Sequence, residues 1–81
     1  MTKSERILME YHTKLIKAHG VSESDRMMIP LCWYINTGRA SADYIDRLDK
    51  ADPRKVMDIL EQDGSVEDVL GRLKVLLYRL K

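Results

Sequence analysis

The chain has few of the residues that build disulfide frameworks or membrane spans. Among its 81 residues there is one cysteine, Cys32, so an internal disulfide cannot form, and a reducing compartment, the cytoplasm, is expected. The longest nearly uncharged stretch, residues 27–37, is too short to cross a bilayer, which predicts no membrane association. The first residues lack the hydrophobic run and cleavage site of a signal peptide.

Aromatic residues are also scarce, and their scarcity limits the core. Phenylalanine is absent and aromatic residues make up 6% of the chain, so Leu, Ile, Val and five Met must fill the interior. A chain of this length forms one domain, here residues 1–81, with a thin core. The combination predicts a small domain whose stability margin is narrow.

Helix-start and helix-stop residues alternate along the chain. Gly20, Gly38 and Gly64 each follow a stretch of apolar residues at helical spacing. The pattern predicts an all-α fold, a compact bundle of about five short helices over residues 3–19, 23–35, 42–51, 53–62 and 66–81. Their expected N-caps are Thr2, Ser22, Ser41, Asp52 and Ser65, of which Thr2, Ser22 and Ser65 are each followed three residues later by a carboxylate.

The second predicted helix contains Pro30. Proline removes one backbone hydrogen bond and crowds the preceding turn, so a kink or break is expected there. Residues 27–35 are apolar nearly all round, which is typical of a buried central helix. We therefore expect this helix at the centre, flanked by the first and last helices, with the third and fourth forming an acidic lid.

Charge is distributed unevenly, although the net charge is only +1. Residues 1–22 carry a net charge of +2, residues 23–71 of −5 and residues 72–81 of +4. If the first and last helices pack side by side, their ends form a basic flank on an acidic body. The alternative is that the cations complement helix C-termini.

The residues that could support catalysis or metal binding are few. Cys32 could act as a nucleophile with His12 or His19, but it lies in an apolar run, where a free cysteine is usually part of the core. His12 and His19 are seven residues apart, about 10.5 Å along a straight helix, too far to share an ion. The sequence therefore predicts no enzyme, no metal site and no cofactor.

Aspartates recur every third residue from residue 43 to residue 52 and predict an acidic ridge on the third helix. This ridge could face a basic partner. Alternatively it is a solvated face, partly neutralised by the i,i+4 pairs Asp43–Arg47 and Asp46–Lys50.

A helix-turn-helix nucleic-acid binder is the alternative function. The segment around Gly38 and Tyr44 resembles the Gly-x-Ser-x-x-Tyr-Ile pattern of helix-turn-helix domains in the partition-protein family, although its spacing is one residue longer, and we infer no membership. The acidic third helix disfavours phosphate binding. The residues that would contact nucleic acid are Arg39, Ser41, Arg47, Arg54 and Lys55.

The last helix carries more apolar residues than one buried face requires. These could meet a partner or pack against the first or second helix. We expect a small non-enzymatic protein–protein interaction module (a regulator, adaptor or inhibitor, such as a bacterial or phage accessory protein) that binds a protein partner, possibly a second copy of itself. The predicted contact residues are Gly71, Lys74, Val75, Tyr78 and Arg79, with His12 and Lys17 as neighbours.

Overall fold

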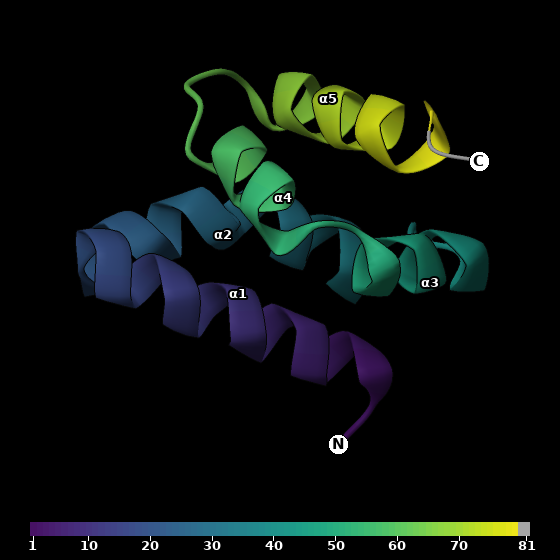
Figure 1. Ribbon diagram of the computed structural model, residues 1–81, viewed down its shortest axis with the longest axis horizontal. Helices are drawn as coiled ribbons and strands as arrows, with labels where there is room; N and C mark the ends of the chain where they lie inside the picture. Colours follow the sequence, from purple (N-terminus) through teal and green to yellow (C-terminus); the bar gives the residue numbers. More distant parts are fainter. Residues whose placement is uncertain (80–81) are drawn as a thin grey trace.

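The computed structural model describes residues 1–79 and confirms the all-α prediction. Five helices and no strand are present in this part of the chain. Residues 80 and 81, to which the last helix was expected to extend, lie outside the described residues. The helices are α1 (Lys3–His19), α2 (Val21–Asn36), α3 (Ala42–Lys50), α4 (Pro53–Leu60) and α5 (Val66–Arg79) (Figure 1).

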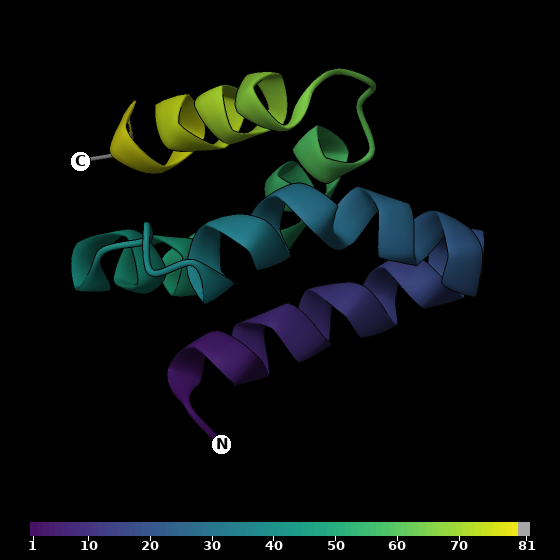
Figure 2. The same ribbon diagram turned by 180° about the vertical axis from the view of Figure 1, so that it is seen from behind.

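Three of the helices form a layer with α2 in the middle. α1 packs along one side of α2 and α5 along the other, as expected for the central helix (Figures 1 and 2). α3 and α4 pack against α1 and α5 and cover one face of this layer. Because α2 separates α1 from α5, these two helices do not lie side by side, and their cations do not form the single basic flank that was considered.

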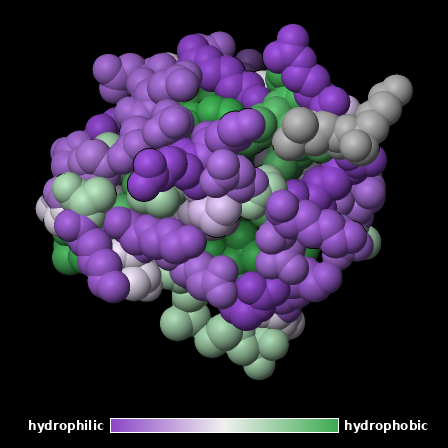
Figure 3. Space-filling model, in the orientation of Figure 1, coloured by the Kyte–Doolittle hydropathy of each residue, from purple (hydrophilic) through white to green (hydrophobic). Residues whose placement is uncertain are grey.

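The core lies where this layer meets α3 and α4. Every helix contributes leucine or another large aliphatic or aromatic side chain to it, and each such buried side chain contributes roughly 1.5–3 kcal/mol. Polar side chains cover most of the face seen in Figure 3, with hydrophobic groups visible in gaps and at the lower edge near α1. The buried apolar residues are Ile7, Tyr11, Leu15, Met27, Met28, Leu31, Tyr44, Leu48, Val56, Leu60, Val69, Leu73 and Leu77.

Four of the five predicted N-caps are confirmed. Thr2 forms a capping box with Glu5, and the Ser65 hydroxyl accepts from the Asp68 N–H at 3.1 Å. Ser41 and Asp52 each accept a hydrogen bond from a backbone N–H of the helix that follows.

Ser22 is not an N-cap, and the corresponding prediction is wrong. α2 begins at Val21, two residues before the predicted start at residue 23, because Gly20 alone joins the two helices. With φ of 89°, Gly20 donates its N–H to the Ile16 carbonyl of α1, and its own carbonyl accepts from the Ser24 N–H of α2. The carboxylate of Asp25 is therefore not used for capping and instead contacts His12 on α1.

α2 continues through Pro30, so the predicted kink or break is not confirmed (Figure 2). Proline in a helix interior costs about 3 kcal/mol. Pro30 and Leu31 are both buried, and α2 packs against helices on two sides, which offsets that cost. The expectation that α2 is buried all round is wrong, because the Ile29 and Trp33 side chains are 54% and 43% exposed.

Candidate interaction surface

The five residues predicted to contact a partner lie together on the outer face of α5. All five are exposed, whereas Val69, Leu73 and Leu77 on the opposite side of the helix are buried. Val75 is 58% exposed and Tyr78 is 37% exposed. The α5 outer face, as we name it, consists of Gly71, Lys74, Val75, Tyr78 and Arg79.

Two further residues expected beside this surface do not lie there. His12 and Lys17 belong to α1, which packs on the other side of α2 from α5. The prediction that they neighbour the α5 outer face depended on α1 and α5 being adjacent. The prediction that His12 and Lys17 neighbour the α5 outer face is therefore wrong.

Gly71 leaves open space on this face. A Cβ built at this position would meet no atom of the described chain within 4 Å. Glycine inside a helix costs about 1 kcal/mol relative to alanine, and packing within residues 1–79 gives no reason for it. The backbone beside Val75, one turn further along α5, is thus accessible to a group from another molecule.

Tyr78 is held in place by neighbours from α3. The guanidinium of Arg47 lies 4.5 Å from the centre of the Tyr78 ring, and the ring centroid of Tyr44 lies 6.5 Å from that of Tyr78. The centre of the Tyr44 ring in turn lies 5.0 Å from that of Tyr34 of α2, with the two ring planes tilted by 56°. These contacts restrict the Tyr78 ring before any partner binds.

The Tyr44 side chain forms the buried end of this aromatic cluster. Burial raises the pKa of the Tyr44 hydroxyl well above its ordinary value, with smaller contributions from Tyr34 and Tyr78. Its hydroxyl has no hydrogen-bond partner among the described residues. The cluster therefore holds Tyr78 through ring packing and through Arg47.

The cations of the α5 outer face have no ion pair within residues 1–79. All ion pairs among these residues involve other basic groups. Lys74 directly precedes Val75 and Arg79 directly follows Tyr78, so each apolar residue of this face has an exposed cation beside it in the sequence. A positively charged border of this kind attracts carboxylates.

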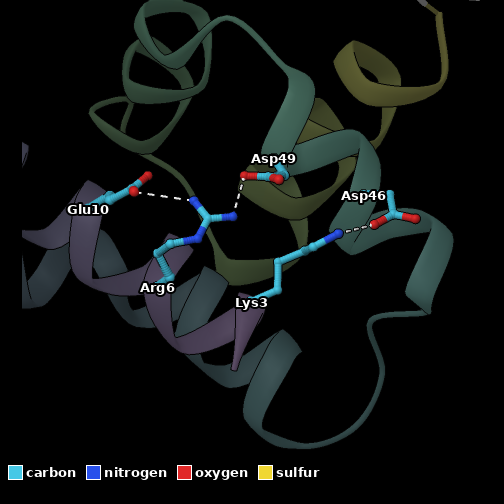
Figure 4. Close-up of polar contacts among 5 residues, drawn as sticks. All are labelled: Lys3, Arg6, Glu10, Asp46 and Asp49. Carbon is cyan, nitrogen blue, oxygen red and sulfur yellow. Dashed lines mark hydrogen bonds and ion pairs between the residues drawn. The ribbon is translucent and has the colours of Figure 1, made fainter. Parts of the chain in front are cut away.

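The cations of α1, in contrast, are paired with the acidic ridge of α3. The Lys3 ammonium donates to Asp46 at 2.7 Å, and Arg6 contacts both Asp49 at 2.9 Å and Glu10 at 3.2 Å (Figure 4). The hydrogen bond from Lys3 and its positive charge lower the pKa of the Asp46 carboxyl. The ion pairs of Asp46 and Asp49 with the cations of α1 thus hold α3 against α1.

The two predicted i,i+4 pairs of the ridge have different outcomes. Asp43 pairs with Arg47 at 2.9 Å, as predicted. Asp46 pairs with Lys3 instead of Lys50, a partner 43 residues away that helical spacing could not identify. The fold thereby neutralises part of the ridge that was considered as a surface for a basic partner.

The candidate nucleophile Cys32 and the candidate base His12 lie on neighbouring helices. Cys32 and His12 line the same groove between α1 and α2. His12, however, contacts Asp25 at 2.9 Å, and Asp25 precedes Cys32 by seven residues, or about 10.5 Å of helix. Burial raises the pKa of the Cys32 thiol, which disfavours the reactive thiolate.

His19 lies apart from this groove. It contacts Glu61, at the end of α4, and ties the C-terminal end of α1 to that helix. Within residues 1–79, no group of three or more His, Cys, Asp or Glu side chains is close enough to hold a metal ion.

The residues of the nucleic-acid alternative are spread over the turn formed by residues 37–41, α3 and α4. Ser41 accepts from the Tyr44 N–H, and Arg47 is bound to Asp43 and to the Leu77 carbonyl. Arg39 lies 4.6 Å from the centre of the Trp33 ring. Arg54 and Lys55 are exposed on α4. Three of the five residues, Arg39, Ser41 and Arg47, therefore already make side-chain contacts within the fold.

Sequence reasoning missed the exposed apolar side of α2, formed by Ile29 and Trp33. These residues are four apart, and the same side of the helix carries Asp25, Arg26 and Asn36 at helical spacing. Those polar residues were the signal that this side faces solvent.

Comparison with protein-family models, with curated proteins and with solved structures finds no match to this chain. Among residues 1–79, none of the helices has both the length and the apolar composition needed to cross a membrane.

Proposed function

We propose that this protein is a non-enzymatic interaction module that binds another protein through the α5 outer face. The observation that supports this most directly is the exposure of Val75 and Tyr78 on one side of a helix, beside the open backbone of Gly71. Val75 lies on the side of α5 opposite Val69, Leu73 and Leu77, and Tyr78 lies at the edge of the core, where its ring packs near Tyr44 and remains 37% exposed. Such a surface fits a regulator, adaptor or inhibitor.

The proposed partner presents an apolar patch bordered by carboxylates. Val75 and the Tyr78 ring supply the apolar centre, and Lys74 and Arg79 supply charge at the border. Tyrosine and arginine are enriched among the residues that dominate binding energy. Because Arg47 already restricts the Tyr78 ring, binding loses less side-chain entropy there.

The proposed location is the cytoplasm. The free thiol of Cys32 fits a reducing compartment, where structural disulfides are rare.

Capture of partners from a lysate of the source cells, followed by titration of the purified partner, tests the proposal. Val75→Asp places a buried charge in the interface and Tyr78→Ala removes the aromatic anchor, so each should weaken binding at least about tenfold. Val21→Asp is the matched control, because Val21 is a valine of α2 that is 60% exposed. Equal binding by all three variants and the wild type would contradict the proposal.

Nucleic-acid binding is the competing outcome. Anisotropy of labelled duplex DNA at low salt separates the two functions, because the electrostatic contribution to DNA affinity is largest there. Our proposal predicts no binding of the duplex. Tight binding of the duplex with a steep salt dependence, lost in an Arg54→Ala/Lys55→Ala variant, would contradict our proposal and support nucleic-acid binding.

A further inference from the structure

One enclosed polar group has no hydrogen-bond partner. Among residues 1–79, the Tyr44 hydroxyl is the only buried side-chain nitrogen or oxygen without one, and Tyr44 itself is 2% exposed. Buried polar groups are paired in the great majority of folded proteins, because an unpaired group loses its bonds to water and gains none. This hydroxyl therefore opposes the packing that encloses it.

Ring packing alone does not require a tyrosine at position 44. The Tyr44 ring packs near those of Tyr34 and Tyr78, whose centres lie 5.0 and 6.5 Å away. A phenylalanine would make the same ring contacts without burying a hydroxyl. Burial raises the pKa of the Tyr44 hydroxyl, so the group keeps its proton and remains a hydrogen-bond donor. The packed cluster thus holds a donor that it does not use.

Tyr78 is the member of the cluster that lies nearest to solvent. It is 37% exposed on the last turn of α5, the helix that packs against α3, whereas Tyr34 is partly buried on α2 (Figure 1). The Tyr78 ring is held by the Arg47 guanidinium, 4.5 Å from its centre, and by the Tyr44 ring. Neither contact is a hydrogen bond, so the ring can turn outward without leaving another polar group unpaired.

We propose that the Tyr78 ring is a lid over the Tyr44 hydroxyl, and that outward rotation of the ring exposes this hydroxyl as a donor to an oxygen acceptor. In the free protein the acceptor is water. In a complex it is a carbonyl or carboxylate oxygen of the bound protein, a consequence that rests on the proposed function because Tyr78 belongs to the α5 outer face.

The contributions that close and open the lid are similar in size. A cation–π contact and an aromatic pair favour the closed position, and the hydrogen bond that the Tyr44 hydroxyl regains favours the open one. The lid is therefore closed in the free protein, but opening it costs little free energy. Arg47 stays in place when the lid opens, because its hydrogen bonds go to Asp43 and to the Leu77 carbonyl.

A double-mutant cycle in urea unfolding of the full chain tests the lid. Tyr44→Phe should lower the unfolding equilibrium constant about fivefold or more, because it removes the unpaired hydroxyl. In a Tyr78→Ala background water already reaches position 44, so the same change should alter that constant by less than about twofold. Circular dichroism spectra of each variant establish that it keeps its helices.

Tyr11→Phe is the matched control for this cycle. Tyr11 is 5% exposed, but its hydroxyl is not an enclosed group without a partner. This variant should therefore be no more stable than the wild type.

Three results would overturn the lid. A Tyr44→Phe variant no more stable than the wild type would mean that the hydroxyl is already paired. Equal stabilisation in the wild-type and Tyr78→Ala backgrounds would mean that Tyr78 does not cover it. Equal stabilisation by Tyr11→Phe would mean that the effect is not specific to position 44. The cycle needs no partner, so it decides the lid whether or not the proposed function holds.

Titration of the purified partner tests the hydroxyl as a donor in the complex. Tyr44→Phe should weaken binding about fivefold although it stabilises the free protein, because the partner's oxygen loses its donor. Unchanged affinity of Tyr44→Phe, with binding still weakened by Val75→Asp, would overturn the donor role and leave the proposed function standing. Unchanged affinity of both variants would contradict the proposed function as well.

Discussion

The guanidinium of Arg47 on α3 lies 4.5 Å from the centre of the Tyr78 ring on α5. The same group donates to the Asp43 carboxylate at 2.9 Å and to the Leu77 carbonyl at 3.2 Å. One side chain therefore joins α3 to the end of α5 and fixes an aromatic residue of the α5 outer face. The fold and the candidate surface are coupled at this point.

Replacing Arg47 should destabilise the protein by about 1–2 kcal/mol, the combined contribution of a cation–π contact and its hydrogen bonds. Arg47→Met keeps most of the side-chain length and removes the charge and the donors. Urea unfolding followed by circular dichroism measures the change. Arg54→Met is the control, because Arg54 is exposed on α4 and forms no side-chain ion pair within residues 1–79. Equal stability of both variants would contradict the role assigned to Arg47.

Removing the Ser41 hydroxyl should cost about 1 kcal/mol, since it accepts the Tyr44 N–H at the start of α3. Ser22→Ala should change stability by less than about 0.5 kcal/mol, because Ser22 lies inside α2 and caps nothing. Thermal unfolding of Ser41→Ala and Ser22→Ala compares the two. A larger loss of stability in Ser22→Ala than in Ser41→Ala would contradict this prediction, because it would mean that Ser22 caps α2.

The Lys3–Asp46 pair predicts a pH dependence of a definite sign. Lys3 lowers the pKa of Asp46 below its ordinary value of 3.8, so folding favours the ionised carboxylate. The resulting stabilisation is present above pH 3.8 and is lost as the pH falls through the pKa of the folded state. Below that range, wild type and Asp46→Asn should converge in the midpoint of urea unfolding.

The control for this pH series is Asp58→Asn, at an exposed carboxylate of α4 that has no ion pair within residues 1–79. Its stability should stay parallel to that of the wild type throughout the series. A difference between wild type and Asp46→Asn that is independent of pH would contradict the role of the ion pair.

Cys32 should react slowly with a disulfide reagent in the folded protein. Burial raises the pKa of its thiol, which decreases the thiolate fraction at neutral pH. Reaction with 5,5′-dithiobis(2-nitrobenzoate), followed by absorbance, should be several-fold faster in urea than in buffer. A faster reaction of the native protein would indicate an activated thiol and would support Cys32 as a nucleophile.

Local chemistry made most of the helix boundaries predictable. Thr2, Ser41, Asp52 and Ser65 bond to backbone groups within three residues, so their roles depend on neighbours in sequence. The prediction for Ser22 was wrong because the positive φ of Gly20 allows α2 to begin directly after Gly20. Ser22 therefore lies inside the helix, and no side chain caps its start.

Tertiary contacts made the remainder unpredictable. The continuity of α2 through Pro30 depends on packing against both α1 and α5, which no local pattern encodes. Lys3 reaches Asp46 across 43 residues. The exposure of Trp33 depends on α3 and α4 covering the other face of the layer. The outward face of α5 was predictable because helical periodicity alone separates Val75 from Leu73 and Leu77.

Site-specific photo-crosslinking at position 75 tests the central claim most directly. A benzophenone amino acid replaces Val75 in one variant and the exposed Arg54 of α4 in another. The account predicts a covalent protein adduct from position 75 in source-cell lysate, none from position 54, and loss of the adduct when Tyr78→Ala is added. Equal adducts from both positions, or an adduct from position 54 alone, would contradict it.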